Sequence, residues 1–232
     1  MKCAAVVLAA GRGRRMNLDT AKQFIQINGF PLLYYSLKAF QESFIDEIVL
    51  VTSKNETDYC REEIVDKYGF DKVSAITEGG KERYHSVACG LKALRPDTDY
   101  VFIHDSARPN ISEEILKRTF DTVVRYGSAI ASVPVKDTVK TADEEGFVTG
   151  TPPRSSVYII QTPQAFEYQA IKKAYETLLQ KEDELNAQGI RITDDAMVME
   201  RFGEKRVKLC EGSYTNIKVT TPEDIELIKL YL

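Results

Sequence analysis

Apolar runs alternate with amphipathic stretches along most of the chain. Residues 3–9 are continuously apolar and end at Ala10-Gly11, which is typical of a strand buried on both faces. Short apolar or β-branched runs recur after it and predict further strands, whereas apolar spacings of three to four predict helices. The predicted strands are 47–52, 72–77, 100–104, 128–135, 206–211 and 216–219. The predicted helices are 32–42, 56–67, 82–94, one between Ser112 and Gly127, 167–181, 194–202 and a last one after Thr221.

Two of these helices carry clear end signals. Ser112 is a good N-terminal cap and Gly127 a good C-terminal one, while Thr221 precedes Pro222 at the start of the last helix. Strands and helices that alternate at this spacing predict a mostly parallel sheet with helices on both faces. The fold class is therefore a Rossmann-like α/β fold with a twisted sheet.

The alternation of predicted strands and helices is interrupted between about residues 136 and 160. Strand-like pieces at 138–141, 147–149 and 157–160 surround Gly146 and Pro152-Pro153. The segment is too long for an ordinary connection and too patterned for disorder. We therefore expect one domain over 1–232 with a protruding β-arm inserted in it, and a homodimer in which the arm pairs with the partner subunit.

Composition narrows the classes of function. Hydrophobic residues make up 43% and charged residues 28% of the 232, as in ordinary globular proteins. The formal net charge of -4 argues against bulk binding of nucleic acid. The longest apolar run is about eight residues, far short of the roughly 20 that cross a bilayer, so we expect no membrane span.

Cysteines and histidines show no metal-binding spacing. No CxxC pair is present, so we expect free, buried thiols in a reducing compartment and no zinc site. Met1 leads directly into strand-like sequence without a targeting segment, which predicts a cytoplasmic location. The residues concerned are Cys3, Cys60, Cys89, Cys210, His85 and His104.

The loop after the first strand carries the strongest chemical signal. It reads Gly11-Arg12-Gly13-Arg14-Arg15-Met16, and Lys22 follows, so four cations lie within eleven residues. Ligands bind at the carboxyl ends of strands in a parallel sheet, and two glycines let backbone N–H groups approach an anion. This concentration of charge suits a triphosphate, although a glycine turn with solvated arginines is the simpler alternative.

Two familiar phosphate-binding loops do not fit this segment. A dinucleotide fingerprint requires a third glycine where Met16 stands, and an acidic residue after the second strand, where 51–54 reads Val-Thr-Ser-Lys. A Walker loop requires Gly-Lys-Ser/Thr, which is absent from the sequence. A hydride-transfer enzyme is therefore disfavoured.

Asp105 ends the strand at 100–104 on the same edge of the sheet. An aspartate there can hold Mg²⁺ that bridges phosphate oxygens, or it can simply cap a turn. The neighbouring His104 reads as structural. The segment 79–83, Gly-Gly-Lys-Glu-Arg, is a further glycine turn on this edge and suits backbone recognition of a base or a phosphate.

Several later groups place cations or hydroxyls beside strand-like sequence. Thr138 with Lys140, then Arg154, and then 215–218 could clamp a phosphorylated second substrate, or they could be exposed charges on an arm. The segment 193–195, Thr-Asp-Asp, is most simply a helix cap, and it could also orient a nearby cation.

Taken together, the motifs resemble a known family. Residues 9–16, A-A-G-R-G-R-R-M, followed by Lys22-Gln23, resemble the signature of sugar-nucleotide-type nucleotidyltransferases. Further motifs in the same order are similar to those of the 2-C-methyl-D-erythritol 4-phosphate cytidylyltransferases. They are HDSARP, VPVKDTVK, PPR, QTPQAF, TDDA and EGSYTNIKVTTPED. Departures from the family pattern are small, at Ala21, Lys81 and Ser106.

The resemblance implies a reaction. The phosphate of 2-C-methyl-D-erythritol 4-phosphate would attack the α-phosphorus of CTP, giving the CDP-linked product and pyrophosphate, with Mg²⁺ required. This is a step of the non-mevalonate isoprenoid pathway. A phosphate monoester is already a nucleophile near neutral pH, so catalysis reduces to positioning and stabilisation of charge.

The resemblance also implies residue roles. The implied catalytic residues are Arg15 and Lys22, and the implied magnesium ligand is Asp105. Residues implied to line the CTP site are Ala9, Ala10, Gly11, Gly13, Gly80 and Ser86. Residues implied to hold the sugar-alcohol phosphate are Arg108, Thr138, Arg154, Thr162, Thr193 and Lys218. Of these, Thr138 and Arg154 are expected to complete the site of the partner subunit across a two-fold axis.

Two rival functions stay open from the sequence. A ribitol-5-phosphate cytidylyltransferase would use the same chemistry with a related motif set, although TDDAMVME and EGSYTNIKVTTPED resemble the methylerythritol enzymes more closely. A non-catalytic nucleotide-binding regulator would keep the fold without turnover. The intact set of Arg15, Lys22, Asp105 and Lys218 argues against the regulator.

Overall fold

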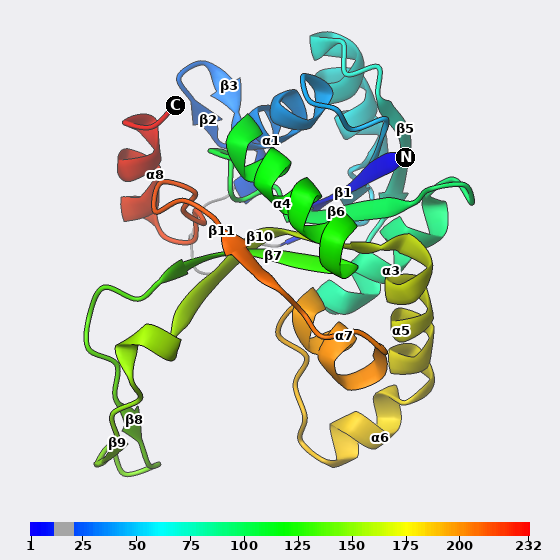
Figure 1. The fold of residues 1–232 in the computed structure, drawn as a ribbon. Coiled ribbons are helices and arrows are strands. Elements are labelled where there is room, and N and C mark those ends of the chain that lie inside the picture. Colours follow the sequence, from blue (N-terminus) through cyan, green and yellow to red (C-terminus); the bar gives the residue numbers. More distant parts are fainter. Residues whose placement is uncertain (12–20) are drawn as a thin grey trace.

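A twisted sheet with helices on both faces forms the body of the molecule (Figure 1). The computed structural model describes residues 1–11 and 21–232, and within them the main sheet has seven strands in the order β11-β7-β10-β6-β1-β4-β5. The strands are β1 (Cys3–Ala9), β4 (Glu47–Thr52), β5 (Val73–Glu78), β6 (Tyr100–Asp105), β7 (Ser128–Pro134), β10 (Tyr158–Glu167) and β11 (Leu209–Glu211). Only β10 runs antiparallel to its neighbours β6 and β7, so the expected Rossmann-like α/β class is confirmed.

Helices cover both faces because β1 is apolar at every position. Alternate residues of β1 enter two separate cores: Ala5 and Val7 pack with α1 and α4, whereas Val6 and Leu8 pack with α3, α5 and α7. The helices are α1 (Leu32–Gln41), α2 (Thr57–Tyr59), α3 (Arg83–Ala93), α4 (Glu113–Tyr126), α5 (Tyr168–Gln180), α6 (Glu182–Ala187), α7 (Asp195–Phe202) and α8 (Pro222–Lys229).

A close approach fixes α3 on the sheet. A Cβ atom at Gly90 would lie 2.4 Å from Cγ1 of Val6 and 3.0 Å from Cγ2 of Val51. Only glycine therefore lets α3 pack at this distance from β1 and β4. A small third core, made of Ile27, Leu32, Val219 and Ile228, ties α8 to the hairpin of β2 (Gln26–Ile27) and β3 (Phe30–Pro31).

The predicted helix ends are confirmed. The Ser112 side chain accepts the N–H of Ile115 at the start of α4, and Gly127 ends that helix in the left-handed region at φ 78°. At α8, Thr221 forms a capping box with Asp224, and Pro222 is the first helical residue. All four cysteines are free, and three of them are buried as expected, whereas Cys89 is only half-buried.

Other predictions are confirmed only in part. The helix expected at 56–67 is present with nearly these bounds, but it is α2 followed by a π-helical stretch at Cys60–Asp66. The strand expected at 206–211 is shorter and is only β11. Residues 216–219 form no strand in the structure. They are irregular and come after the turn at 214–215, and the N–H of Val219 donates to the carbonyl of Ala107. The helix α6 was not predicted.

The largest correction concerns β10. The strand piece expected in the arm at 157–160 is the beginning of this ten-residue strand, which continues into the centre of the main sheet. Polar residues interrupt the apolar pattern at Gln161, Thr162 and Gln164, although all three are buried. Their side chains are hydrogen-bonded within the protein, which a hydrophobicity pattern does not register.

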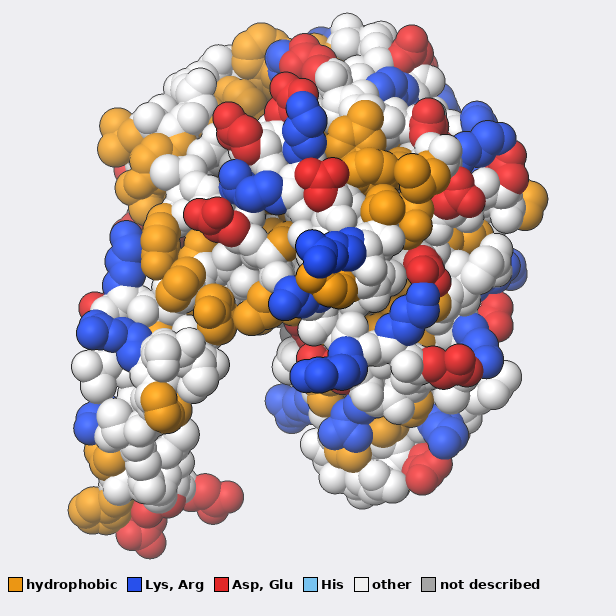
Figure 2. Space-filling view, viewed as in Figure 1, with side chains coloured by type: hydrophobic (Ala, Val, Ile, Leu, Met, Phe, Trp, Pro, Cys, Tyr) orange, Lys and Arg blue, Asp and Glu red, His pale blue; other side chains and the backbone are white. Residues whose placement is uncertain are grey.

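The expected arm protrudes from the body between β7 and β10 (Figure 1). Its tip is a small antiparallel pair, β8 (Thr141–Ala142) and β9 (Val148–Gly150). Apolar side chains on the arm are left uncovered, with Phe147 68% and Val148 62% exposed. Figure 2 shows a deep hollow between the arm and the part of the body that contains α6. Within residues 1–11 and 21–232, none of the helices has the length and apolar character needed to cross a bilayer.

Candidate active site

The site lies where the chain direction across the sheet reverses. The chain continues from β1 to β4 and β5 on one side, whereas β6 lies on the other side of β1, with Leu8 paired to Asp105. In open α/β sheets, ligands bind outside the carboxyl ends of the strands at such a point. A cavity of about 520 Å³ opens there, within the range of small-molecule sites.

Most residues expected around CTP line this cavity. They are Ala9, Ala10, Gly11, Gly80 and Ser86, and they are joined by Lys22, Asp105 and Lys218. Gly13 and Arg15 lie outside the described residues. The segment 79–83, expected on this edge as a glycine turn, also contributes Lys81, Glu82 and Arg83 to the lining, and Ser106 joins them. No role for the side chains of these four residues was expected from the sequence.

Two glycines shape the wall formed by the start of α3. A Cβ atom at Gly80 would lie 2.3 Å from Cβ of His85, and one at Gly79 would lie 2.7 Å from Cβ of Ala10. Glycine therefore lets this turn fit between β1 and the first turn of α3, where the N–H of Gly80 donates to Oγ of Ser86 at 3.2 Å. The amino-terminal end of α3 faces the cavity, and the partial positive charge of a helix start favours an anion there.

The Asp105 carboxylate is held between two cations. Nε of Arg83 donates to Oδ1 at 3.1 Å, and Nζ of Lys218 donates to Oδ2 at 2.5 Å. Burial opposes ionisation of this side chain, but the charges of Arg83 and Lys218 outweigh it and hold the pKa of Asp105 well below its ordinary value. The group is therefore a carboxylate at neutral pH.

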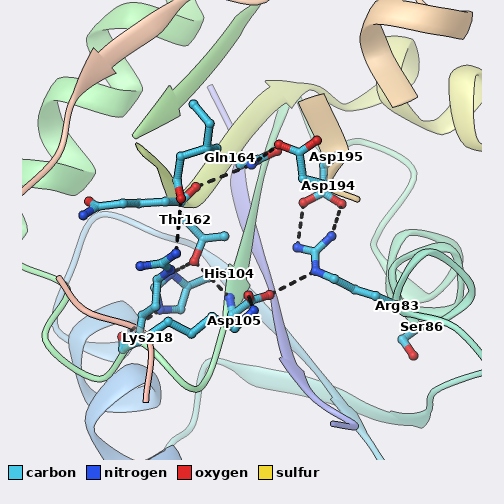
Figure 3. Close-up of polar contacts among 12 residues, drawn as sticks. Arg83, Ser86, His104, Asp105, Thr162, Gln164, Asp194, Asp195 and Lys218 are labelled. Atoms are coloured by element: carbon cyan, nitrogen blue, oxygen red, sulfur yellow. Dashed lines mark hydrogen bonds and ion pairs between the residues drawn. The ribbon is translucent and has the colours of Figure 1, made fainter. Parts of the chain in front are cut away.

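Arg83 also contacts a second carboxylate. Nη1 and Nη2 donate to Oδ1 and Oδ2 of Asp195, each at 2.8 Å (Figure 3). The hydroxyl of Tyr175 donates to the same Oδ1 at 2.6 Å. Burial lowers the pKa of Arg83, but the two carboxylates raise it well above its ordinary value. The neighbouring Asp194 caps α7 as predicted, since its Oδ1 accepts the N–H of Met197.

Lys22 also lines this cavity. It begins a short 3-10 helix, Lys22–Phe24, and its Nζ donates to the carbonyl of Val219 at 2.9 Å. Val219 is the residue after Lys218, so residues distant in sequence bring Lys22 and Lys218 to one cavity.

Thr162 and His104 lie behind Asp105 rather than in the cavity. The Thr162 hydroxyl accepts the N–H of Asp105 at 3.1 Å and lies 3.1 Å from Nδ1 of His104, and both side chains are buried. The expectation that His104 is structural agrees with this position. Arg108 lies nearby and donates to the carbonyls of Asn216 at 2.8 Å and Ile160 at 3.3 Å.

Three residues expected to hold the second substrate lie elsewhere. Thr138, Arg154 and Thr193 are exposed, and the cavity lining does not include them. Thr138 and Arg154 belong to the arm, where Nη1 of Arg154 donates to the carbonyl of Lys136 at 3.0 Å. One copy of the chain therefore does not bring these three residues to Asp105.

The cavity residues fit a magnesium ion that is shared with a ligand. Among residues 1–11 and 21–232, no cluster of three or more His, Cys, Asp or Glu forms an all-protein metal cage. Mg²⁺ usually takes one or two carboxylates together with substrate phosphate oxygens, and the ionised Asp105 at the cavity wall supplies one.

The phosphates of a nucleotide match this cavity in charge, and a nucleotidyltransferase is the class that the fold and the site define together. Residues 3–232 match the family described as 2-C-methyl-D-erythritol 4-phosphate cytidylyltransferase. The chain belongs to this family.

Related sequences and solved structures are similar to this chain over nearly its whole length. Proteins of that name from Lachnospira eligens and Caldanaerobacter subterraneus are 46% and 45% identical, covering 98% and 100% of this chain and 98% and 99% of their own. The crystal structure of 4-diphosphocytidyl-2C-methyl-D-erythritol synthase from Anaerococcus prevotii is 36% identical, with a TM-score of 0.85, covering 99% of this chain and 95% of its own. The Francisella tularensis enzyme is 26% identical, with a TM-score of 0.79 and full coverage of both chains.

Proposed function

We propose that the chain transfers the cytidylyl group of CTP to 2-C-methyl-D-erythritol 4-phosphate, releasing pyrophosphate, in the non-mevalonate isoprenoid pathway. Family membership supports the reaction, and one observation supports its location. The observation is that Ala9 to Gly11, Gly80, Ser86, Lys22 and Lys218 line one cavity around the ionised Asp105.

The chemistry requires no covalent enzyme intermediate. A phosphate oxygen of the acceptor forms a bond to the α-phosphorus of CTP while the bond from that phosphorus to the bridging oxygen of pyrophosphate breaks. Both reactants are anions, so the protein must bring them together and stabilise the charge that builds up on the α-phosphate. In this proposal the start of α3 and the amines of Lys22 and Lys218, which line the cavity, have this role, and Arg15 joins them on the resemblance alone.

Mg²⁺ is part of this proposal. A bound magnesium ion would neutralise charge on the phosphate oxygens of CTP, and Asp105 would hold it from the protein side. Arg83 and Lys218 would then orient that carboxylate through its two oxygens, at 3.1 and 2.5 Å.

We further propose a homodimer whose arms complete the sites. Thr138 and Arg154 lie on the arm, away from the cavity of their own chain, and would reach the acceptor in the partner's site. The uncovered Phe147 and Val148 supply apolar surface for the contact. It stays a prediction that three further residues hold the acceptor substrate, namely Arg108, Thr162 and Thr193. Thr162 would act through its hydrogen bond to Asp105. A cytoplasmic location also stays a prediction, supported by the free cysteines.

Pyrophosphate release tests the reaction. The assay contains CTP and Mg²⁺ and offers 2-C-methyl-D-erythritol 4-phosphate and ribitol 5-phosphate in parallel. We expect strong release with the methylerythritol phosphate alone. Release with ribitol phosphate alone would reassign the acceptor, and CTP binding without release from either acceptor would indicate a regulator.

A further inference from the structure

Arg83 joins two carboxylates that lie on different elements of the fold. It stands at the start of α3, Asp105 at the end of β6, and Asp195 at the start of α7. The two Nη atoms are bound to Asp195 and Nε is bound to Asp105, so the planar guanidinium has one orientation that satisfies all three contacts (Figure 3).

Asp195 is an unusual residue to find at this depth. Its side chain is 0% exposed, and Tyr175 on α5 supplies a further hydrogen bond to Oδ1. Replacing a buried ion pair by well-packed apolar residues is often neutral or stabilising, so the pair is weak evidence of a purely structural role. The ion pair between Asp195 and Arg83 is therefore better explained by its effect on the orientation of Arg83.

The contacts of Asp105 show what Arg83 controls. Lys218, whose side chain is 38% exposed, holds one carboxylate oxygen, and Arg83 holds the other. With both oxygens fixed, the carboxylate has a set rotation at the cavity wall. The Arg83 side chain is partly exposed and lines the cavity, so without its anchor it would be free to turn away and leave Asp105 with Lys218 alone.

We propose that Asp195 is a positioning residue for the nucleotide site, acting through Arg83 to fix the Asp105 carboxylate. This inference rests on the proposed binding of CTP at the cavity. Tyr175 belongs to the same hydrogen-bond network, because it donates to the Asp195 oxygen that also accepts from Nη1 of Arg83. The network connects α5 and α7, which lie outside the cavity lining, to the carboxyl end of β6.

The adjacent Asp194 offers a matched control. It is also a carboxylate at the start of α7, but it accepts from the N–H of Met197 and from Nε2 of Gln164, not from Arg83. Asparagine is as good an N-terminal cap as aspartate, so Asp194→Asn keeps the helix start. The change Asp195→Asn makes the same chemical substitution one residue away and removes the anchor of Arg83.

Titration calorimetry with CTP and Mg²⁺ on the full-length chain tests the proposal, with kcat, KM and Tm measured in parallel. We expect Asp195→Asn to weaken CTP binding and kcat/KM by on the order of 10–100-fold, the usual effect of losing an outer-shell partner. We expect Tyr175→Phe to act in the same direction by a smaller factor and Asp194→Asn to stay within about twofold of the wild type. Equal CTP affinity for wild type, Asp195→Asn and Tyr175→Phe would overturn the proposal.

A double variant separates positioning from folding. Asp195→Asn alone leaves Arg83 without its buried partner and can lower Tm, whereas Arg83→Gln with Asp195→Asn is neutral at both positions. We expect the double variant to recover Tm but not CTP affinity, and recovery of both would mean a structural role only. Because calorimetry needs no acceptor, a wild type that binds CTP without releasing pyrophosphate would refute the proposed function and leave this inference standing.

Discussion

The imidazole of His104 accepts a hydrogen bond from the hydroxyl of Thr162. The two atoms, Nδ1 and Oγ1, are 3.1 Å apart, and Nε2 of the same ring is 3.1 Å from the carbonyl of Arg108. A carbonyl can only accept, so Nε2 carries the proton and Nδ1 is left as the acceptor. The Thr162 oxygen then accepts the N–H of Asp105, and a neutral imidazole completes the chain of bonds behind the site.

This arrangement makes stability depend on pH. Burial is the main cause that lowers the pKa of His104 from its ordinary 6.5 to about 4. In the unfolded chain His104 is protonated below pH 6.5, whereas in the folded chain it stays neutral down to about pH 4. The free energy of unfolding therefore decreases as the pH falls through this window. The two values differ by about 2.5, which is worth roughly 3 kcal/mol at the lower end.

Urea denaturation at a series of pH values between 7.5 and 4 measures this loss. The variant His104→Asn cannot take up the proton, so we expect a flatter dependence of its unfolding free energy on pH, whatever its stability at pH 7.5. The same slope in both proteins would contradict the assignment of the loss to His104.

Lys218 is predicted to stabilise the reacting phosphates. We expect Lys218→Gln to lower kcat by roughly 10²–10³-fold, because it removes a cation that lines the cavity in which the phosphates are proposed to react. Lys229→Gln is the matched control, since Lys229 pairs with Glu226 on the surface of α8. Steady-state kinetics with saturating CTP give the comparison, and a loss below about tenfold for Lys218→Gln would remove it from this role.

Complementation between inactive variants tests the shared sites. If Arg154 serves the partner's cavity, the defects of Lys218→Gln and Arg154→Gln fall in the same site of a mixed dimer, and the other site of that dimer is intact. After unfolding and refolding together at equal amounts, random pairing leaves about a quarter of all sites intact, so we expect about a quarter of wild-type activity. Activity no higher than that of the separate variants would mean that Arg154 acts within its own chain or not at all.

Gly90 is predicted to be required for packing. Gly90→Ala places a methyl group 2.4 Å from Cγ1 of Val6, which is too close for the buried sheet and helix to accept without a shift. We expect a loss of about 1–3 kcal/mol in unfolding free energy, the usual cost of overpacking. Val6→Ala in the same chain removes the clashing atom, so the two changes together should cost less than their sum. Additive losses would contradict the packing argument.

The residues that line the cavity could be predicted from the sequence, but the buried ion pair behind them could not. The residues after β1 and the pair Asp105 and Lys218 belong to short motifs whose chemistry is visible locally, and they meet where the parallel sheet places them. Arg83 and Asp195 are 112 positions apart, and no spacing rule connects them. Only the packing of α7 beside α3 and α5 brings the two charges together.

The buried polar residues of β10 explain the other main error. Gln161 and Thr162 break the apolar pattern that would have extended the strand prediction beyond residue 160. In the structure they bind the loop of Ser213 and Asn216 and the end of β6. Polar residues that are satisfied by distant partners resemble a loop when the sequence is considered alone.

The place of β10 in the sheet also orders how the chain can assemble during synthesis. Strands β1, β4, β5 and β6 are complete once residue 105 has been made, and they are direct neighbours. Strand β7 is made next, but it has no contact with β6 in the ladder until β10 enters between them, after the whole arm has been translated. The edges of β6 and β7 that β10 later covers therefore have no strand partner while about thirty further residues are translated. The length of the arm sets most of this interval.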